Sequence, residues 1–156
     1  MATMKNVIIN ERYRLNECLG AGSFGQGRLF LSCYSFTTPH THIYIQGWKV
    51  TDLKDSKEVF LKTYKFDGCS GKHSKDKVWK TQVEYITKEI RIARDGIQNN
   101  KFNHPNVVQF YDAQFRGTAK RPDGTLIKDA VFPFIVTELV NGLELDQYLK
   151  KYAAFF

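Results

Sequence analysis

The chain has 156 residues, the size of one domain or of a part of a larger one. Apolar residues make up 42% of it and aromatic residues 14%, enough for a packed core, so wholesale disorder is excluded. The formal charge of +7 permits an anionic partner, and three cysteines, an odd and sparse count, exclude a secreted disulfide scaffold. No apolar run approaches the ~20 residues that span a bilayer. We therefore expect a cytoplasmic protein without a membrane span, with a nuclear or organellar assembly left open.

The first part of the chain reads as strands. Apolar residues flank a glycine cluster between residues 13 and 31, which predicts two strands joined by a flexible turn, the second over 28–31. Residues 32–58 are polar and mixed, and a stretch of this length between two strands predicts an insertion. Its segments 43–45 and 48–50 are candidates for an extra strand or hairpin, and a docking role is our interpretation of the whole stretch.

A strand, a loop and a helix are expected next. Residues 59–66 alternate in part and predict a strand, and the Gly/Ser/Lys-rich residues 67–77 predict a loop. Apolar side chains recur near helical spacing over 78–92, with charges between them, which predicts an amphipathic helix. Residues 95–101 look like a second insertion, placed after this helix.

The remaining pattern predicts two strands and a short helix. The segments 107–115 and 130–139 are β-rich, and between them the sequence Arg-Pro-Asp-Gly at 121–124 is a strong turn signal. Residues 143–152 are expected to form a short helix.

Five short motifs follow one another along these elements. The glycines at 19–25 lead into a predicted strand, whereas the glycines of a dinucleotide-binding fold lead into a helix. The five are LGAGSFG at 19–25, VFLK at 59–62, Glu89 in the predicted helix, HPNVV at 104–108 and IVTELVNG at 135–142. In this order they resemble the N-terminal, small lobe of eukaryotic protein kinases, over nearly the whole chain from Tyr13 to Leu149.

The resemblance implies an α+β fold. It would be a five-stranded antiparallel sheet with one packed helix, the small lobe of a protein kinase, with insertions after strand two and after the helix. Residues 1–12 would be an N-terminal extension and 13–141 the kinase-like lobe, with 32–58 as its insertion. Residues 142–156 would be the exit from the hinge and the truncated start of the first helix of the C-terminal lobe.

The resemblance also implies a nucleotide site. Glycine backbone amides approach phosphate oxygens closely, a strand lysine neutralises the phosphates, and a helix glutamate positions that lysine. The lysine would be Lys62 and the glutamate Glu89, with Glu84 as the alternative if the helix register slips. The full set implied is Gly20, Gly22, Ser23, Phe24, Gly25, Lys62, Glu89, Thr137, Glu138, Val140 and Glu144. In it Thr137 would be the gatekeeper, Glu138 and Val140 would offer backbone groups to adenine, and Glu144 would lie near the ribose.

Two residues depart from the family pattern in the adenine pocket. Gly27 stands where the family has valine, and Phe60 stands where it has the alanine next but one before the lysine. Alternate strand residues share a face, so Phe60 and Lys62 should both face the nucleotide. Our hypothesis is a paired swap in which the Phe60 ring fills the space that Gly27 leaves. The ring would then either stack on adenine or block its pocket.

The sequence contains no H-R-D-x-x-x-x-N motif, and no D-F-G follows HPN. Without these loops there is no positioned base and no magnesium clamp, so we predict no catalytic residue, no metal ligand and no activity for the chain alone. ATP is the expected cofactor, weakly held or absent, and magnesium is expected when the missing lobe is supplied. The family activity is phosphoryl transfer to protein Ser/Thr. The alternative function is a non-catalytic, pseudokinase-type interaction or scaffold module in a larger assembly.

A protein partner or the missing C-terminal lobe is the expected partner. The lysine-rich stretch 54–80 permits nucleic-acid binding, but no aromatic–basic interleaving in it marks a recognised nucleic-acid module, so we do not expect a nucleic acid. His40 and His42 are a weak metal motif, and Cys69 is interpreted as an ordinary surface thiol.

Overall fold

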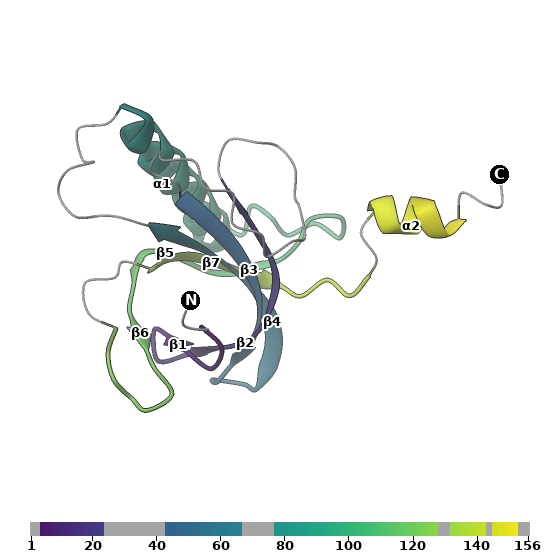
Figure 1. Ribbon diagram of the computed structural model, residues 1–156. Coiled ribbons are helices and arrows are strands. Elements are labelled where there is room, and N and C mark those ends of the chain that lie inside the picture. Colours follow the sequence, from purple (N-terminus) through teal and green to yellow (C-terminus); the bar gives the residue numbers. More distant parts are fainter. Residues whose placement is uncertain (1–3, 24–42, 67–76, 128–131, 143–144, 153–156) are drawn as a thin grey trace.

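The structure is a computed structural model, and it describes residues 4–23, 43–66, 77–127, 132–142 and 145–152. Within these residues, seven strands form one antiparallel sheet in the order β5-β7-β4-β3-β2-β1-β6, accompanied by two helices (Figure 1). The elements are β1 (Ile8–Ile9), β2 (Tyr13–Ser23), β3 (Ile43–Asp52), β4 (Lys57–Phe66), α1 (Lys77–Gln98), β5 (Phe110–Gly117), β6 (Ala119–Lys120), β7 (Phe132–Glu138) and α2 (Leu145–Tyr152).

The prediction of a five-stranded sheet with one packed helix is therefore wrong. The two further strands, β1 and β6, have two residues each, too few to produce an alternating pattern. β1 pairs on one side with the nearby β2, with Ile8 opposite Arg14. On its other side it pairs with β6, more than 100 positions away, with Ile8 opposite Lys120 and Ile9 opposite Ala119. This pairing continues the sheet beyond β2 and curls it into a half-barrel. Figure 1 shows β1 and β6 on the far side of the curl from α1, and the second helix, α2, standing apart from the sheet.

The inside of the half-barrel holds the main hydrophobic core. Strand residues two apart share a face, so Val59 and Leu61 of β4 point inward together, as Phe134 and Val136 of β7 do. Other inward side chains come from β1, β2 and β3; they are Ile9, Tyr13, Leu15, Trp48 and Val50. Val7 and Ile9 thus belong to the core, although they lie in the stretch 1–12 that the sequence assigned to an extension.

The outer face of the sheet is covered in part by α1. Ile86, Ile90 and Ala93, spaced by about one helical turn, pack against Tyr64 of β4 and Ile135 of β7. This second core lies over one end of β4. The other end of the same face, toward Phe60, is not covered by α1.

Helix α1 is longer than predicted, because it includes residues 95–98, which were expected to begin an insertion. The Phe102 ring folds back against Gly96, where an added Cβ would lie 1.9 Å from a ring carbon. The absence of a side chain at Gly96 therefore leaves room for the Phe102 ring. The same ring packs against Phe110, with 5.1 Å between the ring centroids. A glycine that weakens helix propensity here makes room for packing.

Residues 43–52 form a single strand, β3, where the sequence suggested an optional strand or hairpin. β3 pairs with β4 over its whole length, from Ile43↔Phe66 to Asp52↔Lys57, and with β2 on its other side. This part of the 32–58 stretch is therefore an interior strand of the sheet. The strand expected at 28–31 lies outside the described residues.

The turn signal at 121–124 is confirmed. The amide of Gly124 donates to the Arg121 carbonyl at 2.9 Å, and Gly124 adopts a φ of 84°, in the region that favours glycine. The Asp123 carboxylate accepts the Thr125 amide at 2.8 Å, a common turn contact.

Asp52 forms a buried polar anchor between the start of β2 and the end of β3. Its side chain is 6% exposed, and Arg12 donates to both carboxylate oxygens, at 2.9 and 2.7 Å. The amide of Lys54 is a third donor, at 3.1 Å. The guanidinium hydrogen bonds hold the pKa of Asp52 below its usual value.

Stability should therefore depend on the ionisation of Asp52. Because its folded pKa lies below the unfolded value of about 3.9, the carboxylate stabilises the fold above that pH, and the contribution is lost as the pH falls through the folded pKa. At pH 7 we expect Asp52→Asn to cost about 2 kcal/mol in urea unfolding. Below about pH 4 the gap between the two proteins should narrow. A gap that stays constant down to the lowest pH at which both fold would contradict this.

Candidate functional site

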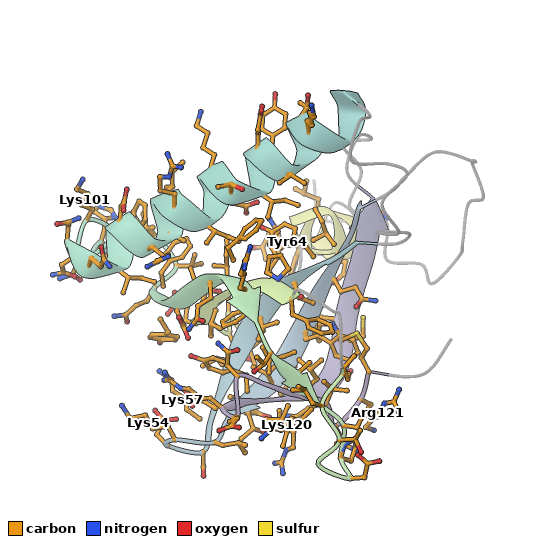
Figure 2. The ribbon with its side chains drawn as sticks, turned by 90° about the vertical axis from the view of Figure 1, so that its left-hand side faces the viewer. Lys54, Lys57, Tyr64, Lys101, Lys120 and Arg121 are labelled. Atoms are coloured by element: carbon orange, nitrogen blue, oxygen red, sulfur yellow. The ribbon has the colours of Figure 1, made fainter. Side chains whose placement is uncertain are left out.

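Three polar side chains meet where α1 crosses β4. Lys62 and Tyr64 lie two residues apart on β4 and share its outer face, and Glu89 reaches them from α1. The Lys62 Nζ atom lies 2.5 Å from Glu89 Oε1, and the Tyr64 hydroxyl donates to Glu89 Oε2 at 2.6 Å. Figure 2 shows Tyr64 between α1 and the sheet. Both carboxylate oxygens of Glu89 are thus bound by side chains of one strand, β4.

The electrostatics fix the roles of the three groups. Tyr64 is 0% exposed, and burial, followed by its hydrogen bond to Glu89, raises the pKa of the hydroxyl far above its usual value. The hydroxyl therefore stays protonated and donates. The side chains of Lys62 and Glu89 are 29% and 40% exposed, so the ion pair is open to solvent on one side. An ammonium has three donors, which leaves Lys62 able to contact an anion while it is held by Glu89.

Beside Lys62 the next two residues of the cross-strand row are glycines. Across the strands, Lys62 lies opposite Gly47 of β3, and Gly47 lies opposite Gly20 of β2. Two glycines in one cross-strand row contribute no side chains of their own to this part of the face. A ligand that contacts Lys62 can therefore approach the β2 backbone at Gly20, whereas at Gly47 the ring of Phe60 lies against the β3 backbone.

Phe60 lies next along the same face. A Cβ added at Gly47 would be 2.9 Å from two carbons of the Phe60 ring, so the ring rests against the Gly47 backbone. The swap hypothesis placed this ring in the space left by Gly27, which lies outside the described residues. The sequence did not indicate a role for Gly47, because its place opposite Lys62 depends on the register between β3 and β4, which no sequence motif predicts.

The residues expected to form the hinge lie at and just after the end of β7, next to β4. Thr137 is opposite Phe60, and its hydroxyl donates to the Glu138 carbonyl at 3.1 Å. The amide of Glu138 donates to the Gln109 carbonyl at 2.9 Å, so the chain itself uses this donor. Val140 is 65% exposed.

The structure thus brings together part of the expected set. The ion pair expected between Lys62 and Glu89 is present, whereas the alternative, Glu84, is exposed on α1. Gly20, Gly22 and Ser23 lie in β2, two strands away from β4. The positions expected for Phe24, Gly25, Gly27 and Glu144 lie outside the described residues, as do those of His40, His42 and Cys69. Within the part of the chain that is described, no group of three or more His, Cys, Asp or Glu residues could hold a metal ion.

No protein-family model matches the chain, and no curated protein matches it in sequence. None of the helices among the described residues is long and apolar enough to cross a membrane.

Proposed function

We propose that this chain is the ATP-binding half of a protein kinase-like protein. The kinase family transfers a phosphoryl group to protein Ser/Thr, and the motifs in the sequence are the ground for the proposal. The chain would bind the nucleotide between the glycine segment of β2 and the hinge at the end of β7. Lys62 would contact the phosphates, and Glu89 would hold Lys62 in place.

The observation that carries the proposal is the ion pair between Lys62 and Glu89. In protein kinases a strand lysine and a helix glutamate must pair for the lysine to reach the α and β phosphates. Here the two residues come from a strand and a helix, lie 27 positions apart in sequence, and approach within 2.5 Å. Gly20, in the glycine segment of β2, supports the same proposal, because phosphates need backbone without Cβ atoms nearby.

Catalysis by these 156 residues alone is not part of the proposal. The sequence contains neither the catalytic-loop motif nor D-F-G after HPN, and phosphoryl transfer depends on the aspartates that these motifs supply. We expect nucleotide binding without turnover, and magnesium would be held mainly by a lobe that supplies those residues.

The second candidate function is a pseudokinase-type scaffold, which the Phe60 ring favours. The ring is half-buried, lies opposite Thr137 and rests on Gly47, so it occupies the face on which a base would lie. If the ring fills the base pocket, the lobe binds no nucleotide, and its surface carries the function.

Calorimetry with Mg·ATP tests the first candidate. We expect wild-type binding that Lys62→Ala weakens at least about tenfold, since a charge-assisted contact to phosphate is lost. The matched control is Lys54→Ala, because Lys54 is exposed at the end of the molecule away from α1 (Figure 2) and its variant removes the same charge. Equal losses in both variants would contradict a specific phosphate contact.

Phe60→Ala separates the two candidates in the same titration. Tighter binding by this variant would mean that the ring blocks the base, and weaker binding would mean that it stacks on the base. If neither wild type nor Phe60→Ala binds ATP at millimolar concentration while both remain folded by circular dichroism, the nucleotide proposal is wrong.

A further inference from the structure

A groove runs along the outer edge of β5. β5 lies at one end of the sheet, and among the described residues it is hydrogen-bonded as a strand to β7 alone. The groove has a volume of about 520 Å³. It is lined by Arg94, Ile97 and Gln98 of α1 and by residues 111–116 of β5.

The lining places the groove along the strand edge. Successive residues of a strand point to opposite faces, so a depression on one face would be lined by alternate residues. Here six consecutive residues of β5 contribute, as expected for a groove that follows the strand backbone. The last turns of α1 form the wall above it.

An exposed strand edge can accept a further strand. Natural edges are often protected by β-bulges, and β5 has irregularities between Phe110 and Asp112 and between Gln114 and Gly117. These leave Asp112 to Gln114 as the regular stretch. An added strand would pair over a short length, so side-chain contacts must supply much of the affinity.

Charge indicates the kind of segment that fits. Arg94 and Arg116 are exposed at the groove, one on each element that lines it. The acidic residue of the lining is Asp112, and its carboxylate accepts a hydrogen bond from the buried Tyr13 hydroxyl at 3.1 Å, toward the inside of the half-barrel. The two guanidinium groups therefore set the charge that faces an occupant. Arginine recognises carboxylates in two-pronged geometry, and a positive groove favours an acidic partner.

The groove also offers apolar contact. Ile97 and Phe115, both partly buried, and the buried Ala113 lie where the helix wall meets the strand. An extended segment directs alternate side chains to this wall, so an apolar residue between acidic ones would fit.

We infer that the β5 edge binds an extended, acidic segment of a partner protein by strand addition, with its carboxylates on Arg94 and Arg116. The lining of this groove includes neither Lys62 nor Gly20, so the inference does not rest on nucleotide binding. It gives a place on this chain for the protein partner expected from the sequence.

The test uses a fluorescent synthetic heptapeptide, Thr-Val-Glu-Val-Glu-Val-Thr, titrated against the full chain. We expect saturable binding that the double variant Arg94→Glu/Arg116→Glu weakens by about tenfold or more. The matched control is Arg14→Glu/Arg121→Glu, which changes the net charge equally at exposed arginines that do not line the groove. Figure 2 shows Arg121 at the end of the molecule away from α1. Equal weakening in the two double variants would mean that net charge alone attracts the peptide.

Backbone pairing is tested with two N-methylated forms of the same peptide. A strand added to one edge pairs through every second amide, so methylation of one alternate set should abolish binding and methylation of the other should not. If both forms bind like the parent peptide, strand addition is wrong. A peptide with lysine in place of glutamate should bind more weakly than the parent, and equal affinity would contradict recognition by the two arginines. Absence of binding to folded wild-type protein would overturn the inference.

Discussion

Replacing Gly117 by alanine is expected to destabilise the fold by about 3 kcal/mol. Gly117 ends β5 opposite Phe132 of β7, and an added Cβ would lie 2.6 Å from the Phe132 carbonyl oxygen. It would also lie 2.9 Å from the ring of Phe134, which is fully buried in the main core. A backbone carbonyl within a sheet moves little, so the clash must displace either β7 or the packed ring.

Thermal unfolding of the Gly117→Ala variant should show a melting temperature lower by roughly 6–12 °C, from the usual scaling for a domain of this size. The matched control is Gly142→Ala, because a Cβ at Gly142 meets nothing within 4 Å. We expect that control to stay within about 0.5 kcal/mol of wild type. If the two variants melt at the same temperature, the close approach of β5 and β7 is not as described.

The second large effect concerns Glu89. Replacement by alanine should cost about 2–3 kcal/mol, because the buried Tyr64 hydroxyl loses its acceptor. The ion pair with Lys62 adds little to this, since both its partners are partly exposed and a solvated pair contributes at most about 1 kcal/mol. The stability of the contact between α1 and β4 thus depends more on the hydrogen bond from Tyr64 to Glu89 than on the ion pair between Lys62 and Glu89.

A double-mutant cycle isolates the tyrosine contribution. In a Tyr64→Phe background there is no hydroxyl left without a partner, so Glu89→Ala should cost about 1 kcal/mol, which gives a coupling energy of about 1–2 kcal/mol. Urea unfolding of the four proteins measures it. A coupling energy near zero would show that the Tyr64–Glu89 hydrogen bond does not contribute. The parallel cycle with Lys62→Ala should give a smaller value.

Local pattern predicted the long elements of this fold well. The helix was anticipated because its apolar spacing is regular, and its register placed Glu89 toward Lys62. Its end was misjudged because residues 95–101 looked like an insertion between the helix and HPN. In the structure 95–98 belong to α1, and Gly96 leaves room for the Phe102 ring, a contact made after the chain turns back. Sequence pattern reports propensity, and here packing overrides it.

Features that depend on residues far apart in the sequence were not predicted. β1 and β6 have no pattern of their own and exist because the curled sheet brings them together. Gly47 became part of the candidate site through its register opposite Lys62, and the groove at β5 depends on which strand lies at the edge. The Lys62–Glu89 contact was predictable for the opposite reason, since a resemblance supplied the pairing that local pattern lacks.

The pairing of β1 with β6 has a consequence for the order of folding. Asn10 and Thr118, which hydrogen-bond beside this pairing, lie 108 positions apart. A long loop must therefore close before the pairing forms, and two-residue strands offset little of the conformational entropy that is lost. Such contacts form late and open early. β1 can pair at once with the nearby β2, with Ile8 opposite Arg14, but its other edge stays open until β6 arrives. Until then the core around Val7 and Ile9 lacks Ala119, which β6 supplies.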